Sequence, residues 1–143
     1  MSTSPVSQSD VHTPVGFNAI ELAASLTVAD LPSSLRWYRD VIGFAVDKEH
    51  ERDGVLRAVA LRAGQVRLLL TQDNGAKGEQ RTKGEGFSLQ FTTRDDIDAL
   101  AAGVVARGGV LASDPADAFG ARVFRVRDAD GFLLVISSER TRS

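Results

Sequence analysis

Few side chains of this sequence suit metal or nucleophilic chemistry. The chain has 143 residues, no cysteine, and two histidines, His12 and His50. Without cysteine it has no disulfide, no thiolate ligand and no cysteine nucleophile. His12 lies in a polar, aperiodic segment and His50 ends a short charged run, so both are predicted to be solvated. Glu21 is the carboxylate that strand alternation best places to act as a general base.

Two motifs resemble ion-binding or phosphate-binding loops, and both favour a plainer interpretation. Asp128-Ala129-Asp130-Gly131 matches the start of a calcium loop, but the later oxygen ligands are missing, so a turn is predicted. Residues 72–86 hold four glycines, but no Gly-Lys-Ser/Thr opens a helix after them. A linker is therefore predicted there, rather than a phosphate cradle.

The composition narrows the class of protein. Hydrophobic residues make up 43% and charged residues 25%, as in soluble globular proteins with a core. The net charge is −2 and the basic residues are scattered, so no nucleic-acid partner is expected. No apolar run is long enough to span a membrane, and the N-terminus does not resemble a secretory signal. A cytoplasmic location is expected.

The clearest element is a helix predicted over 31–42. Asp30 is a suitable N-cap, Pro32 falls in the first turn, and Gly43 suits the left-handed residue that ends a helix. One apolar face recurs at helical spacing, formed by Leu31, Leu35, Tyr38 and Ile42.

Strands are predicted on both sides of this helix from alternating hydrophobicity. The first spans 17–29, and the others span 45–50, 55–62 and 65–71, with turns at 52–54 and 63–64. In the first strand the apolar set is expected to face the helix and a small polar set to face away. The polar set comprises Glu21, Ala23, Ser25 and Thr27.

The second half repeats this order. Strand 87–93 precedes a helix over 95–107, a short strand at 110–112, a loop over 114–120, and strands 121–127 and 132–138. The interval from Asp30 to Gly43 equals that from Asp96 to Gly109. The sequence thus predicts an α+β fold of two tandem βαβββ modules, each a curved mixed sheet packed on a helix. The expected organisation is a flexible tail over 1–16, one domain over 17–138 (module 1 17–72, linker 73–85, module 2 86–138), and a C-terminal tail over 139–143.

This doubled unit resembles the vicinal oxygen chelate superfamily, which includes glyoxalase I, the bleomycin resistance proteins and the extradiol dioxygenases. The residues that carry the resemblance are 26–31, Ser34-Leu35, 37–40, 42–44 and 128–134. The resemblance implies that each module curls its sheet into half of a cup. It also implies a homodimer whose cups are completed across the interface.

Metal-using members of that superfamily carry a His on the first strand, a His or Gln on the first strand of the other half, and a Glu on the last strand. The corresponding residues here are Ala23, Ser88 and Val135. Alanine and valine side chains cannot coordinate, and a serine hydroxyl is a poor ligand for a divalent ion. No metal cofactor is therefore expected. An unusual oxygen-rich site built on Glu21 and Gln90 is the alternative.

The function expected from the resemblance is that of a metal-free protein that binds a small organic molecule, as in resistance proteins that sequester an antibiotic. The candidate ligand-binding residues are Glu21, Ser25, Thr27, Arg57, Ser88, Gln90, Thr92 and Arg122. For Arg57 and Arg122, solvation on the outer face is an equal alternative.

Two other classes of function stay open. One is an enzyme, either a lyase, isomerase or dioxygenase with a displaced metal site, or a metal-free acid–base catalyst that uses Glu21. The other is a module that has lost ligand binding and serves as a dimer partner.

Overall fold

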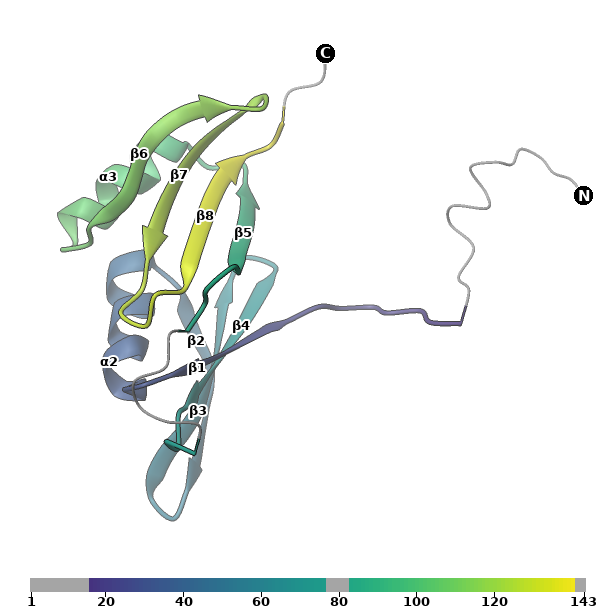
Figure 1. The fold of residues 1–143 in the computed structure, drawn as a ribbon, viewed down its shortest axis with the longest axis vertical. Helices are drawn as coiled ribbons and strands as arrows, with labels where there is room; N and C mark the ends of the chain where they lie inside the picture. The colour runs from purple at the N-terminus through teal and green to yellow at the C-terminus, as the bar shows by residue number, and fades with distance from the viewer. Residues whose placement is uncertain (1–15, 77–82, 141–143) are drawn as a thin grey trace, which may run out of the picture.

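Two copies of a βαβββ module make up the structure (Figure 1). The computed structural model describes residues 16–76 and 83–140. Each module holds a four-stranded sheet, with strand orders β1-β4-β3-β2 and β5-β8-β7-β6. In each sheet the first strand pairs in parallel with the last, and the other pairs are antiparallel. The predicted α+β fold of two tandem modules is confirmed.

The element bounds follow the predicted order. Module 1 contains β1 (Ala24–Val28), α2 (Leu31–Arg36), η1 (Trp37–Ile42), β2 (Ala45–Arg52), β3 (Val55–Ala63) and β4 (Val66–Gln72). Module 2 contains β5 (Ser88–Thr93), α3 (Ile97–Ala106), β6 (Leu111–Ala118), β7 (Ala121–Arg127) and β8 (Leu133–Ser138). The predicted tails, except for residues 16 and 139–140, and residues 77–82 of the predicted linker lie outside the described residues. No helix within the described ranges is both long and apolar enough to cross a membrane.

The first helix has the predicted ends. Asp30 Oδ1 accepts a hydrogen bond from the Ser33 backbone N–H at 3.2 Å, which satisfies a donor in the first turn. Gly43 ends the helix with φ of 110°, a conformation that glycine adopts without a Cβ clash. The second half, η1, is a π-helical turn in which the N–H of Gly43 donates to the Tyr38 carbonyl at 3.0 Å.

Two sequence predictions about strands are wrong. The strand predicted over 17–29 begins only at Ala24, because the pairing of β1 with β4 starts there, and Gly16–Ala23 runs away from the body as an extended arm (Figure 1). The loop predicted over 114–120 is instead the second half of β6, which pairs with β7 as far as Ala118. Pro115 fits there because β6 is an edge strand whose register shifts between Ser113 and Ala116.

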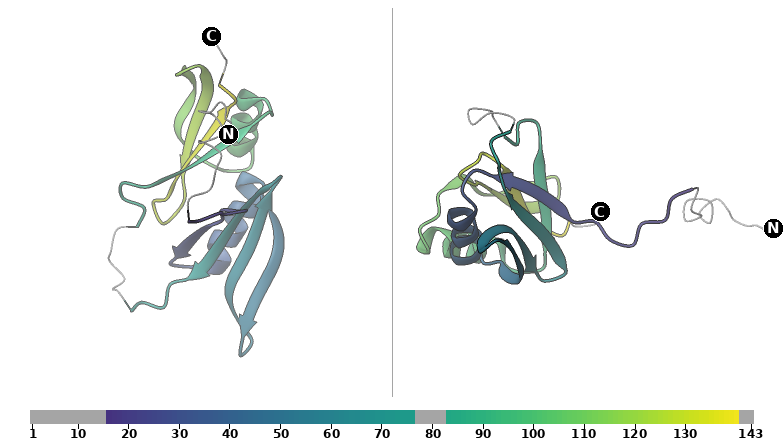
Figure 2. Two further views of the ribbon diagram at one scale, coloured as in Figure 1. Left: turned by 90° about the vertical axis from the view of Figure 1, so that its right-hand side faces the viewer. Right: turned by 90° about the horizontal axis from the view of Figure 1, so that it is seen from below.

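Each sheet carries its helix on one face only. The helix α2–η1 buries its apolar face on sheet 1, and this core continues into module 2 through Val126, Phe132 and Leu134. The helix α3 packs on sheet 2, where Ile97, Ala101, Val104 and Phe124 form a second cluster. We call the opposite, helix-free faces of the two sheets the first and second open faces. Figure 2 shows the two sheets one beyond the other along the molecule.

A buried hydrogen bond joins the modules. The Tyr38 hydroxyl donates to Asp128 Oδ2 at 2.6 Å, and the backbone N–H groups of Asp130 and Phe132 both donate to Asp128 Oδ1 at 2.9 Å. Tyr38 is 0% and Asp128 7% exposed. Burial raises the pKa of the Asp128 carboxyl, although these three hydrogen bonds act in the opposite direction. Burial and the nearby Asp128 charge raise the pKa of Tyr38 far above its usual value.

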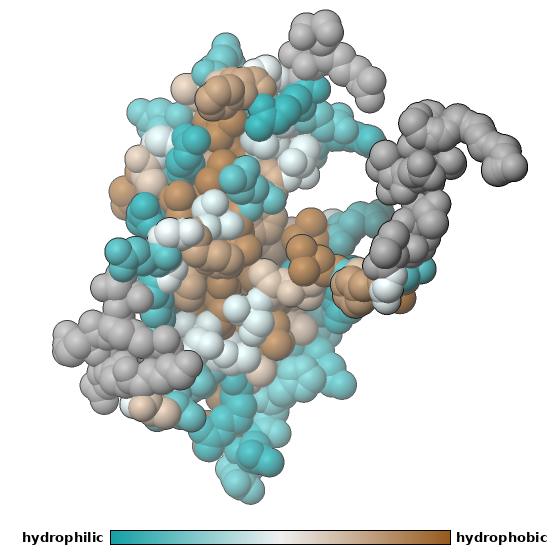
Figure 3. Space-filling view, turned by 45° about the vertical axis from the view of Figure 1, so that its right-hand side comes forward, coloured by the Kyte–Doolittle hydropathy of each residue, from teal (hydrophilic) through white to brown (hydrophobic). Residues whose placement is uncertain are grey.

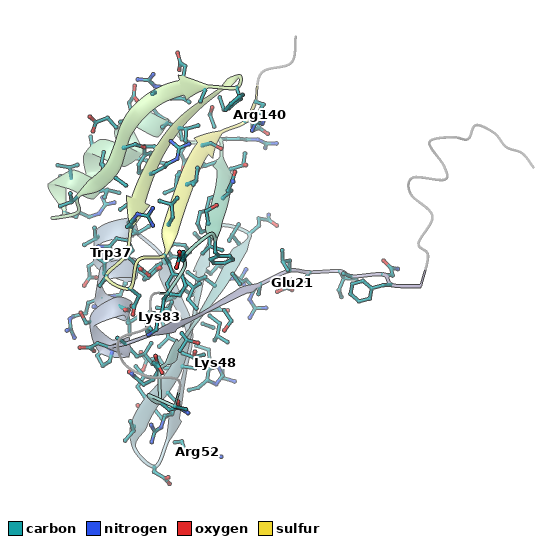
Figure 4. The ribbon with its side chains drawn as sticks, in the orientation of Figure 1. Glu21, Trp37, Lys48, Arg52, Lys83 and Arg140 are labelled. Carbon is teal, nitrogen blue, oxygen red and sulfur yellow. The ribbon has the colours of Figure 1, made fainter. Side chains whose placement is uncertain are left out.

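The predicted turn at 128–131 is confirmed, and it forms a second link between the modules. Asp130 Oδ1 accepts a hydrogen bond from the backbone N–H of Ala29 at 2.9 Å. The Lys83 ammonium, whose side chain is 9% exposed, lies 2.8 Å from Asp73 and 3.4 Å from Asp130 (Figure 4). This one turn therefore contacts the end of β1, the helix and the connector.

Replacing Tyr38 by Phe should lower the free energy of unfolding by about 1–3 kcal/mol, because Asp128 Oδ2 stays buried and loses its donor. Urea unfolding followed by circular dichroism measures this change, with an unchanged slope expected. In an Asp128→Asn background the same substitution should cost less, since a neutral amide is cheaper to bury without a partner than a carboxylate. Equal costs in both backgrounds would attribute the loss to ring packing.

The raised pKa of Asp128 predicts a pH dependence of stability. Between the ordinary value of 3.8 and the higher folded-state value, the folded protein holds a proton that the unfolded chain has released. The free energy of unfolding therefore falls as pH rises through this interval. Asp128→Asn removes this term, so the stability of the variant relative to the parent should rise from about pH 3 to about pH 7. A difference that is constant with pH, or that falls, would contradict the assignment.

Candidate functional site

The first open face is small and polar. Ser25 and Thr27 of β1 lie on it, opposite Leu69 and Thr71 of β4. The hydroxyl oxygens of Thr27 and Thr71 lie 3.2 Å apart, within hydrogen-bonding distance. The facing residues of β3 are alanines, Ala58 and Ala60. Leu69 is the one large side chain in this part of the face, and Arg62 and Arg67 lie further along β3 and β4.

The second open face has an apolar floor. Ala121, Val123 and Val135 are buried and cluster with Ala118 and Leu133, although neither helix of the described residues covers this side of the sheet. Polar side chains surround this floor. They are Ser88, Gln90 and Thr92 of β5, Ser137 of β8, and Arg125 and Arg127 of β7.

The structure divides the predicted site residues between two surfaces. Ser25 and Thr27 lie on the first open face, whereas Ser88, Gln90 and Thr92 lie on the second. No strand ladder joins the two sheets. These two groups of residues therefore lie on different sheets of the described chain.

The other three predicted residues are on neither open face. Glu21 lies on the arm ahead of β1, and its Oε2 accepts from Arg67 Nη1 at 3.2 Å (Figure 4). Arg57 is exposed and follows the alternation of Val59 and Leu61, which face the helix. Arg122 lies on the helix side of β7, where its Nε donates to Asp98 Oδ1 of α3 at 3.1 Å. The two arginines match the outer-face alternative.

Sequence reasoning missed Arg125 and Arg127. Arg125 is half-buried and its Nη1 donates to the Ser113 hydroxyl at 3.4 Å, while Arg127 Nη1 donates to the Gly131 carbonyl at 2.9 Å. Strand alternation could have found them. Side chains point to alternate faces along a strand, and Phe124 faces the helix, so Arg125 and Arg127, one and three residues later, must face away from it.

A concavity lies between the two modules. It has a volume of about 640 Å³ and a largely aromatic and aliphatic lining that includes Phe44, Phe91, Phe124 and Ile136. Figure 3 shows apolar side chains gathered across the middle of the molecule, over the junction of the two modules. We call this concavity the inter-module cleft.

Comparison with known proteins identifies the family. The family model described as Glyoxalase/Bleomycin resistance protein/Dioxygenase superfamily matches residues 17–136. The chain belongs to this superfamily. No curated protein matches the sequence.

Solved structures of superfamily type share the fold. TioX from Micromonospora sp. ML1 is 20% identical, with a TM-score of 0.66 over 84% of this chain and 98% of that one. A glyoxylase/bleomycin resistance protein/dioxygenase domain from Frankia sp. EAN1pec is 21% identical, with a TM-score of 0.72 over 89% and 96% of the two chains. A glyoxalase/bleomycin resistance protein from Streptomyces sp. CB03234 is 21% identical, with a TM-score of 0.64 over 80% and 96%. At these identities the likeness shows the fold alone.

The donor set does not fit the divalent metal that the superfamily fold can carry. Ser88 and Val135 lie on the second open face, and Ala23 lies at the end of the arm. These positions offer a hydroxyl, an isopropyl group and a methyl group, none of which is a good ligand for such an ion. Gln90, on the second open face, and Glu21, on the arm beside Arg67, are also not brought together. Among residues 16–76 and 83–140, no three His, Cys, Asp or Glu side chains cluster in a way that could hold a metal ion.

Proposed function

We propose that this member of the superfamily binds a small, partly apolar organic molecule on its second open face without a metal ion. The observation that carries this proposal is the buried apolar floor of Ala121, Val123 and Val135, which neither described helix covers. Binding sites for small molecules are commonly apolar surfaces with a few well-placed polar groups. Here Gln90 and Arg125 are such groups, on strands that flank the floor.

Binding is favoured over catalysis by the chemistry of this face. The strands β5, β7 and β8 contain no carboxylate and no imidazole that could act as a general base. Of the two aspartates of β6, Asp117 is ion-paired with Arg122, and Asp114 lies in the irregular stretch between Ser113 and Ala116. Glu21, the catalytic candidate from the sequence, precedes β1 of module 1 and is ion-paired with Arg67 of that module, away from the second open face. Sequestration of a ligand needs neither group.

A thermal-shift screen with polycyclic and peptide antibiotics tests this function. A ligand at a hundredfold excess over its Kd should stabilise the protein by about 2.7 kcal/mol, equally with and without EDTA. Gln90→Trp should abolish the shift by filling the open face, whereas Val105→Trp, at a half-exposed position of α3, should not. Loss of the shift in EDTA, or stoichiometric metal in the purified protein, would refute metal-free binding. No shift with any compound would favour the interaction-module alternative.

We also propose that the arm Gly16–Ala23 packs on a second copy of the chain. Its apolar side chains Phe17, Ile20 and Leu22 are 82%, 98% and 93% exposed, and the arm leaves the body of its own chain. Three large apolar side chains that protrude together mark an interaction surface. The apolar inter-module cleft of a partner offers a matching surface, and a reciprocal exchange would produce a two-fold dimer.

Replacing Phe17, Ile20 and Leu22 together by Ser should convert a dimer into a monomer, because the buried apolar contact is lost. Sedimentation velocity at several protein concentrations measures the change. Val105→Ser with Val110→Ser is the matched control, since both valines are exposed but lie outside the arm. A parent protein that sediments as a monomer, or a triple variant that stays dimeric, would refute this role of the arm.

A further inference from the structure

We propose that the second open face recognises the anionic group of an organic acid through Arg125 and Arg127. This inference rests on the proposed function, because it names the class of ligand that the apolar floor would hold. The ligand class is an apolar or aromatic body that carries a carboxylate or a similar acid group.

The two guanidinium groups belong to the same side of β7. Their positions are two apart on the strand, so their Cβ atoms lie about 7 Å from each other on one face. Arg125 pairs with Val135 and Arg127 with Leu133 on β8, and the next strand places Gln90 and Ser88 beside those residues. Each arginine is therefore followed across the sheet by an apolar side chain and then by a neutral polar one.

Neither arginine has a carboxylate partner among the described residues. In the described parts of the chain, no carboxylate lies within 4.0 Å of Arg125 or Arg127, and each makes its side-chain hydrogen bond to a neutral oxygen. A guanidinium group has five N–H donors, so most donors of both groups remain available. Paired donors of this kind match the two oxygens of a carboxylate.

The first module provides an internal comparison. Arg62 and Arg67 lie on its sheet, and both are 3.5 Å from Asp47 Oδ2, while Arg67 is also 3.2 Å from Glu21. These two arginines of module 1 thus have carboxylate partners within the chain. The arginines of the second open face do not, and their like charges repel each other until an anion binds between or beside them.

The surroundings of the two arginines leave space for a ligand and strengthen their interaction with an anion. Arg127, Ser88 and Leu133 line a hollow of about 790 Å³ at the end of the sheet. Glu85 and Asp130 also line the hollow, but among the ion pairs of the described residues neither is paired with Arg127, and Asp130 lies 3.4 Å from the Lys83 ammonium. Arg125 is half-buried beside the apolar floor, and ion pairs are stronger where water is partly excluded.

Calorimetric titration with matched acids and amides tests the inference. The probes are 2-naphthoate and anthracene-2-carboxylate, each compared with its carboxamide, which has the same shape and no charge. The acids should bind about tenfold to a hundredfold more tightly than the amides, as expected for charge-assisted hydrogen bonds. Arg125→Gln and Arg127→Gln should each reduce this preference, Arg125→Lys should retain part of it, and added salt should weaken acid binding only.

Arg122→Gln is the matched control, because Arg122 lies on the same strand but faces the helix and is paired with Asp98 and Asp117. It should leave the preference for acids unchanged. Equal affinities for acids and amides would overturn the inference and leave the proposed function standing. An equal loss of preference in Arg122→Gln would also overturn it, since net charge alone would then explain the effect. If neither probe series binds, the inference is rejected, and the antibiotic screen decides separately on the proposed function. Thermal unfolding of each variant confirms that it is folded.

Discussion

The hydrogen bond between Tyr38 and Asp128 fixes the relation of the two modules. A buried carboxylate is costly unless donors surround it, and Asp128 receives three hydrogen bonds, two from its own turn and one from the helix of the other module. The bond therefore holds the β7–β8 turn against η1. Since β7 and β8 form the floor of the second open face, a contact in the core also sets the position of the candidate binding surface.

The alternation of side chains along β7 places core residues on one face of the sheet and candidate binding residues on the other. On β7, Phe124 and Val126 are fully buried against the helix side, whereas Arg125 and Arg127 point the other way. The same alternation explains why Arg122 cannot join them, since it shares its face with Phe124 and pairs with Asp98 of the helix. A change on one face of this strand can therefore alter binding while the core on the other face is kept.

Local patterns predicted most of the fold. The capping residues Asp30 and Gly43 marked the ends of the first helix, and period-two alternation located most strands. Local patterns could not show whether a strand has a neighbour. Residues 17–23 alternate like a strand, but they pair with no strand among the described residues. The end of β6 shows the opposite error. Its Pro-containing sequence was predicted to be a loop, but it pairs with β7. The candidate site was predicted only in part, because Arg125 and Arg122 differ in the face they occupy and not in residue type.

The two modules keep the same architecture but differ in the charge of their open faces. In module 1, Arg62 and Arg67 are ion-paired with Asp47, and Arg67 is also paired with Glu21 of the arm. In module 2, the equivalent side of the sheet combines an apolar floor with two arginines that have no carboxylate partner in the described chain. Where the helices pack, the helix-facing sides of both sheets are apolar, since a close-packed core allows little else there. This difference in charge lies on the sides of the sheets that face away from the helices, where a binding surface can change its ligand while the helix-packed core is kept.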